Sequence, residues 1–120
     1  MAYLISHALI MIVGIMHIWI MILECALWTK PIGMKTFRMN PTKAAETKVL
    51  AFNQGVYNGF LALALIWGVV EGKQDLQLYG LICVFIAGLV GSATVGKKIF
   101  FVQSLPALIA LIVFWRVQLA

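Results

Sequence analysis

A long, mainly apolar run at the start of the chain, from Tyr3 to Trp28, constrains the fold more than any other feature. A helix needs about 20 mostly apolar residues to cross a bilayer, and in lipid each backbone polar group must be bonded within its own segment. The run is too long for the apolar part of a signal peptide and has no cleavage signal, so we interpret it as a retained helix. Three similar runs follow, and together they predict spanning helices at about residues 3–28, 41–70, 77–95 and 99–117.

Composition excludes the other broad classes of protein. Hydrophobic residues make up 63% and charged residues 11% of the 120 residues, which leaves too little polar surface to cover a soluble core. Aromatic residues make up 12%, too many for a disordered chain. We therefore expect a single integral membrane domain over residues 1–120, with an all-α bundle of four transmembrane helices and the lipid bilayer as its partner.

The basic residues set the predicted topology. The net charge is +5, and seven of the nine Lys and Arg residues lie in the connections 29–48 and 96–98. The positive-inside rule places both connections in the cytoplasm, and with four spans this puts both termini outside. Because the basic residues lie between apolar runs and no RNA-binding motif is present, we expect no nucleic-acid partner.

The first connection contains a helix start. Asn40 followed by Pro41 is typical of an N-cap with proline at the first helical position, so the second helix begins before the membrane. Residues 34–39 mix apolar and basic side chains. Two interpretations of this stretch stay open: it lies on anionic lipid headgroups, or it is an ordinary basic loop.

Polar residues inside the predicted spans form the candidate site. His17 and Glu24 are seven residues apart and share one face of the first helix, where Gly14 would leave room for a neighbour or a ligand. Counting the helical rise from the cytoplasmic ends of the helices gives two layers of polar side chains. The deep layer contains His17 and Asn58, and the shallow layer contains Glu24, Asn53, Gln54 and Gln103.

This arrangement predicts a polar cavity open to the cytoplasm, with Glu24 as its charged group and His17 at its inner end. Such a pair can pass protons or hold a cationic or hydrogen-bonding ligand. In the structural alternative, Glu24 snorkels or pairs with Lys30 or Lys48, and the imidazole and amides join helices by hydrogen bonds. We expect no metal and no cofactor, because neither cysteine has a partner at zinc spacing.

Small residues at helical spacing predict close helix packing. Gly55 and Gly59 lie four apart in the second predicted helix, and Gly88 and Gly91 lie three apart in the third. Small residues let helix backbones approach closely in lipid. We therefore expect these two helices to pack closely against neighbouring helices, either within one chain or between copies.

Several stretches carry a resemblance that covers nearly the whole chain. The most specific is Asn-Gln-Gly-x-Tyr-Asn-Gly at 53–59, within the run from Lys48 to Phe60. The others are His17 and Glu24 followed by Leu27-Trp28-Thr29, then Ala87-Gly88, Ala93-Thr94-Val95 and the run from Val102 to Ala107. In these stretches the chain resembles a bacterial family of small four-helix integral membrane proteins catalogued as a domain of unknown function. The resemblance implies a multi-pass protein of the bacterial cytoplasmic membrane and implies no activity.

Three functions fit these residues. The leading hypothesis is a protein that binds or transports an unidentified small molecule at the polar residues His17, Glu24, Asn53, Gln54, Asn58 and Gln103. Transport by alternating access usually needs two related halves, so we expect a homodimer. An intramembrane enzyme would instead use Glu24 and His17 as an acid–base pair on a lipid-like substrate. A structural or accessory subunit of a membrane complex would use the glycine stripes as interfaces.

Overall fold

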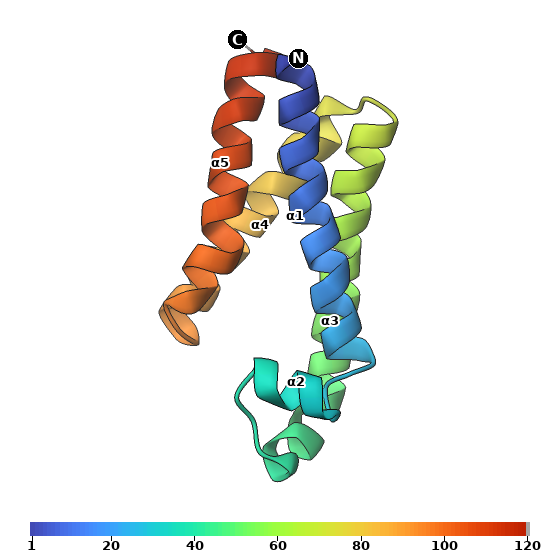
Figure 1. The fold of residues 1–120 in the computed structure, drawn as a ribbon, viewed down its shortest axis with the longest axis vertical. Coiled ribbons are helices and arrows are strands. Elements are labelled where there is room, and N and C mark those ends of the chain that lie inside the picture. Colours follow the sequence, from blue (N-terminus) through green and yellow to red (C-terminus); the bar gives the residue numbers. More distant parts are fainter. Residues whose placement is uncertain (120) are drawn as a thin grey trace. The chain divides into compact units, whose positions relative to one another are not determined.

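The computed structural model describes residues 1–119, in which every regular element is a helix (Figure 1). Four helical segments are long and apolar enough to cross a membrane: α1 (Ala2–Cys25), α3 (Pro41–Val70), α4 (Gln74–Thr94) and the segment Phe100–Leu119. The prediction of an all-α fold with four helices of spanning length is confirmed.

The chain divides into two compact units, which we describe separately. The middle unit is Met16–Phe60, and the terminal unit combines Met1–Ile15 with the residues from Leu61 onward. The expectation of one integral membrane domain stays a prediction.

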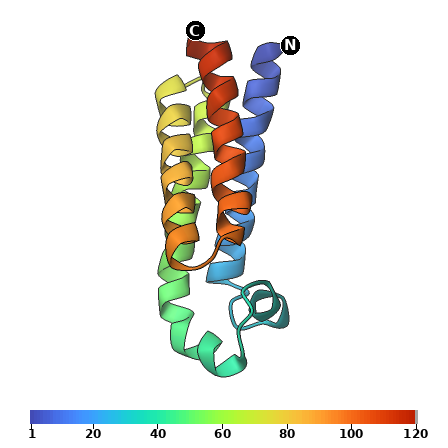
Figure 2. The same cartoon turned by 90° about the vertical axis from the view of Figure 1, so that its left-hand side faces the viewer.

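The terminal unit is built around a set of buried apolar side chains. In Figure 2, α4 and α5 (Leu105–Phe114) lie beside each other and run in opposite directions. A Cβ atom added to Gly14 would lie 3.0 Å from Ile66 Cγ1, so the room predicted beside this glycine is filled by α3. The core residues are Ile10, Val13, Leu65, Leu81, Val84, Ala107, Ala110 and Phe114.

The fourth spanning segment is irregular around a proline. Its first part, η1 (Phe100–Ser104), is a π-helical turn in which the Leu105 N–H donates to the Phe100 carbonyl. Pro106 follows in the first turn of α5. Proline has no N–H and its ring crowds the carbonyl four residues earlier, and the wider turn accommodates both effects. A second π-helical turn, η2 (Trp115–Leu119), follows α5.

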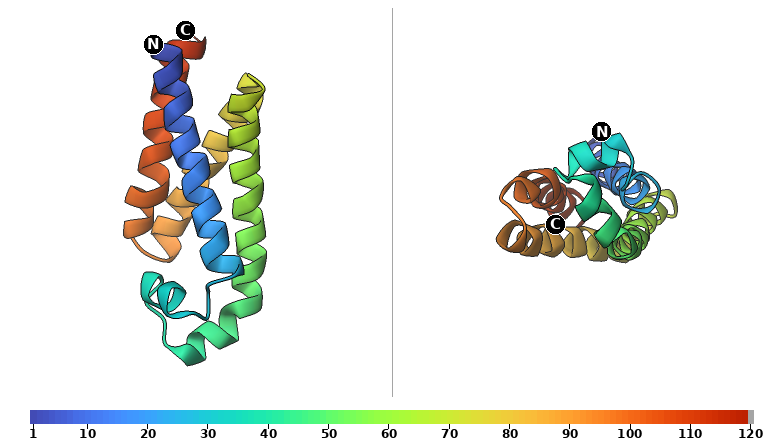
Figure 3. Two further views of the ribbon diagram at one scale, coloured as in Figure 1. Left: turned by 45° about the vertical axis from the view of Figure 1, so that its right-hand side comes forward. Right: turned by 90° about the horizontal axis from the view of Figure 1, so that it is seen from below.

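A polar network joins the helices at one end of the terminal unit, where α1 begins and η2 lies (Figures 1 and 3). Gln118 Nε2 donates to Ser6 Oγ at 2.8 Å and to Gln77 Oε1 at 3.0 Å. Gln77 Nε2 donates to the Gly68 carbonyl at 2.8 Å. Ser6 and Gln77 are fully buried, so this network satisfies side chains that would otherwise be costly inside a helix bundle.

In the middle unit, the first helix ends earlier than predicted, at Cys25 and not at residue 28. Pro31 begins the short helix α2 (Pro31–Thr36), which the sequence analysis missed. The residue before a proline is pushed towards an extended conformation, and Lys30 has φ −89° and ψ 160°. The chain therefore turns after Cys25, and the Lys30 N–H bonds to the Leu27 carbonyl at 3.1 Å.

The connection between α2 and α3 is ordered by specific contacts. Gly33 is buried, and a Cβ atom on it would overlap the Leu27 carbonyl oxygen and lie 3.0 Å from Trp28 Cα. The Trp28 and Phe37 rings pack with their centroids 4.8 Å apart. Asn40 Oδ1 accepts the Lys43 N–H at 2.8 Å, which confirms the predicted N-cap of α3.

Candidate functional site

Two polar side chains from different helices meet inside the middle unit. Asn58 Nδ2 of α3 donates a hydrogen bond to Glu24 Oε1 of α1. Glu24 is 8% exposed and Asn58 is 6% exposed, so both side chains are buried. The lysines proposed as alternative partners, Lys30 and Lys48, are exposed, and the Glu24 carboxylate is bonded to an amide instead.

Glycines allow α1 and α3 to approach at this point. A Cβ atom on Gly55 would overlap Cys25 Sγ and lie 3.1 Å from Glu24 Cβ, and one on Gly59 would lie 2.8 Å from Met21 Sδ. The close packing predicted for this glycine pair therefore occurs within the chain, and its partner is α1.

A groove of about 260 Å³ opens beside Glu24 in the same unit. Trp28 is fixed in its wall, because its Nε1 donates to Thr47 Oγ1 at 3.0 Å and that hydroxyl donates to the Lys43 carbonyl at 2.7 Å. The lining residues are Glu24, Trp28, Thr47, Leu50, Ala51 and Gln54, of which Glu24 alone carries a charge. The wall of the groove is therefore acidic, aromatic and apolar.

The second carboxylate oxygen of Glu24, Oε2, is open to this groove. Within residues 1–119 the hydrogen bond of Glu24 is made by Oε1, and no buried side-chain oxygen or nitrogen in that range lacks a partner. No hydrogen bond to Oε2 is found within the described residues, so this oxygen is not sealed from the surface, and Glu24 lines the groove. A ligand in the groove can thus donate a hydrogen bond to an oxygen on a largely buried carboxylate.

The structure gathers only part of the predicted polar cluster. Asn58 is bonded to Glu24, and Gln54 lines the groove together with Glu24. His17 is fully buried and does not line the groove. Asn53 is exposed, and its Nδ2 donates to the Val49 carbonyl of its own helix at 3.1 Å.

Gln103 is half-buried in η1 and belongs to the terminal unit. Within residues 1–119 no group of three or more His, Cys, Asp and Glu side chains is placed to hold a metal ion.

Two groove residues that carry polar or aromatic groups, Trp28 and Thr47, are absent from the predicted site. A signal for Thr47 was present, because residues 47, 51, 54 and 58 follow helical spacing on one face of α3. Thr47 falls in the predicted connection 29–48 and therefore lies outside the predicted polar layers. Trp28 was assigned to a spanning helix, whereas it follows the end of α1.

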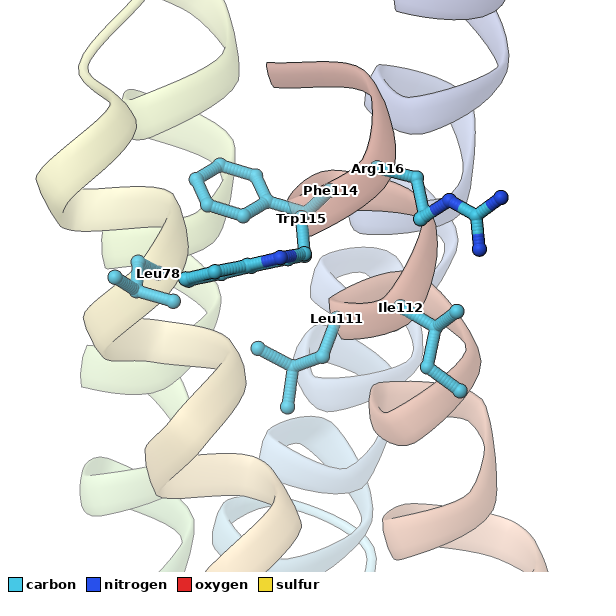
Figure 4. A pocket seen from close by; sticks show the side chains of 6 residues that line it. All are labelled: Leu78, Leu111, Ile112, Phe114, Trp115 and Arg116. Atoms are coloured by element: carbon cyan, nitrogen blue, oxygen red, sulfur yellow. The ribbon is translucent and has the colours of Figure 1, made fainter. Parts of the chain in front are cut away.

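The terminal unit has another groove, of about 280 Å³, with different chemistry (Figure 4). In Figure 4 the Trp115 ring reaches towards Leu78, whereas Arg116 points away from that ring. Apart from Arg116 the lining is apolar: Leu78, Leu111, Ile112, Phe114 and Trp115. Because this groove offers no buried polar group to orient a ligand, the Glu24 groove is the candidate site.

Fold and site together define a small helical protein with four helices long and apolar enough to span a membrane and a buried carboxylate that borders a groove. The chain belongs to the family described as protein of unknown function (DUF1304), which matches residues 11–115. It is similar to the uncharacterized protein YpaA of Lactococcus lactis subsp. lactis (strain IL1403), with 31% identity over 106 residues that cover 85% of this chain and 89% of that protein. No solved structure matches the chain. The resemblance to a bacterial family of unknown function is confirmed.

Proposed function

We propose that this chain is a multi-pass protein of the bacterial cytoplasmic membrane that binds a small molecule in the Glu24 groove. The observation that carries the proposal is the Glu24 carboxylate, buried with one oxygen bonded to Asn58 and the other open to the groove. An ionisable side chain in a spanning helix is costly and ordinarily marks a functional site. Transport of the ligand would follow if a homodimer supplied the second half that alternating access needs.

The position of His17 argues against the intramembrane enzyme. Its side chain is fully buried and lies outside the groove lining, so the imidazole is not presented to a substrate held in the groove at Glu24. The accessory-subunit hypothesis explains the Glu24–Asn58 bond as a link between helices, but it gives no role to the open Oε2 atom. Ligand binding accounts for both oxygens of the carboxylate.

Native mass spectrometry of the protein released from a mild detergent tests this proposal. We expect the wild type to retain a small molecule as a discrete mass increment, and we expect Glu24→Gln to lose it, because the amide removes the charge and keeps the shape. Glu46→Gln is the matched control, since Glu46 is an exposed carboxylate on α3 of the same unit. A wild type without any retained molecule, or equal retention in all three proteins, would contradict the proposal. The same spectra report the subunit count, for which we expect a dimer.

The proposed topology has both termini outside and the basic connections in the cytoplasm. Cysteine labelling tests it in a background where Cys25 and Cys83 are replaced by serine. We expect Glu71→Cys to react with a membrane-impermeant maleimide in intact cells and Lys35→Cys to react only after the membrane is permeabilised. Both side chains are exposed, so reactivity reports the side of the membrane and not burial. Labelling of Lys35→Cys in intact cells would overturn the topology.

A further inference from the structure

We infer that the ligand of the Glu24 groove is a small organic cation, a protonated amine carried on an apolar or aromatic body. This inference rests on the proposed function, and it adds the chemical class of the molecule bound. Its basis is the placement of one open carboxylate oxygen beside an indole ring whose own donor is already used.

The charge of the groove favours a positively charged ligand. Glu24 is the one charged residue in its lining. The basic side chains of the middle unit lie outside that lining and are exposed; they are Lys30, Lys35, Arg38, Lys43 and Lys48. An anionic ligand would meet a carboxylate in a partly buried site, where a like charge is strongly unfavourable. A cationic ligand would provide the opposite charge that a buried carboxylate needs.

The groove offers hydrogen-bond acceptors, so its ligand must carry donors. A carboxylate accepts hydrogen bonds and donates none, so the ligand atom next to Glu24 Oε2 must be a donor. The Trp28 N–H is bonded to Thr47, so the indole presents no donor to the groove. Gln54 is exposed in the lining, and its amide oxygen provides a second acceptor. An ammonium group, which carries several N–H donors and a positive charge, satisfies both acceptors.

The groove also has an apolar and aromatic wall, which suits a ligand with a hydrocarbon body. Trp28, Leu50 and Ala51 line the groove beside the carboxylate. A cation near an indole ring is attracted by the negative face of the ring, most strongly where water is excluded. Leu50 and Ala51 provide contact for a hydrocarbon body. The volume of about 260 Å³ lies just below the usual range of ligand pockets, about 300–1,000 Å³, so the ligand is small.

Isothermal titration of the full-length protein in mild detergent tests the class of ligand with two probes of matched size. Phenethylammonium carries the charge, and phenethyl alcohol is its neutral counterpart. We expect the ammonium probe to bind the wild type and Glu46→Gln equally, and to bind Glu24→Gln at least about tenfold more weakly, because the charge partner is gone. We expect the alcohol to bind weakly and equally to all three proteins.

A second variant tests the inference without changing a buried residue. Gln54 is exposed, so Gln54→Lys places a positive charge in the groove with little effect on packing. We expect Gln54→Lys to weaken binding of the ammonium probe by about tenfold or more, because it adds a like charge. Gln54→Met only removes the second acceptor and adds no charge, so we expect it to weaken binding by less than Gln54→Lys.

The possible outcomes separate the inference from the proposed function. Preferential binding of the ammonium probe that depends on Glu24 supports both. Equal binding of alcohol and ammonium, unaffected by Glu24→Gln and Gln54→Lys, overturns the cationic class and leaves the molecule retained in native mass spectra to define another. Absence of binding by either probe to the wild type overturns the cationic class, and a wild type that also retains no molecule in native spectra overturns the proposed function.

Discussion

Replacing Asn58 by leucine is expected to lower the free energy of unfolding by about 2–3 kcal/mol. Leucine is close to asparagine in size, so packing against α1 is largely kept, but the Glu24 carboxylate loses the donor to its Oε1 atom while it stays buried. Denaturant titration in detergent, followed by tryptophan fluorescence, measures the change. Asn53→Leu is the control, since Asn53 is exposed and bonds within its own helix, and we expect a change within about 0.5 kcal/mol.

The double variant Glu24→Leu with Asn58→Leu tests whether the polar pair is needed for stability. Replacing both partners of a buried polar interaction by apolar groups of similar shape is often nearly neutral. We therefore expect the double variant to recover most of the stability that Asn58→Leu loses. A double variant as unstable as the single one would mean that the pair holds α1 and α3 together, and the binding hypothesis would lose its main argument.

Replacing Gly88 by alanine is expected to lower the free energy of unfolding by about 1–3 kcal/mol, because the new atom overpacks a close helix contact. A Cβ atom there would overlap Ser104 Oγ and lie 2.6 Å from the Ser104 backbone nitrogen, which cannot move without displacing η1. It would also strain the hydrogen bond that Ser104 Oγ donates to the Phe85 carbonyl at 2.8 Å.

Gly96→Ala is the matched control for Gly88→Ala, since nothing lies within 4 Å of a Cβ atom at Gly96. We expect it to melt within a few degrees of the wild type, in line with the small effect of most surface substitutions. If the two alanine variants melt alike, α4 and η1 are not packed as described.

Hydropathy identifies the spanning helices because it depends on summed composition, whereas their ends depend on single residues. The first helix stops at Cys25 although the apolar run continues to Trp28. The turn is set by Pro31 and by Gly33, which lies against the Leu27 carbonyl. A window average does not register such contacts, and for the same reason the six-residue helix α2 was missed.

The candidate site shows a different limit of sequence reasoning. Counting helical rise placed Glu24 in the shallow layer and Asn58 in the deep layer, yet the two side chains are bonded. Side chains on a helix lean towards its N-terminus. Because α1 and α3 are antiparallel here, as the contacts of Gly55 with Cys25 and of Gly59 with Met21 show, the two side chains lean towards each other.

Depth alone also does not specify which helices are neighbours or which side of a helix a residue occupies. Gln103 was counted in the same layer as Glu24, but it belongs to the terminal unit. Asn53 lies only five residues from Asn58, yet a five-residue step rotates it well away from the face that meets α1. The helical spacing of Thr47, Gln54 and Asn58 was the better guide.

We propose that the Glu24–Asn58 pair is present for binding and not for stability. Native mass spectrometry of the folded double variant Glu24→Leu with Asn58→Leu, compared with the wild type, tests it most directly. We expect the double variant to unfold close to the wild type and to carry no small molecule, while the wild type carries one. A folded double variant that retains the same molecule in the same proportion would show that the Glu24–Asn58 pair does not serve binding.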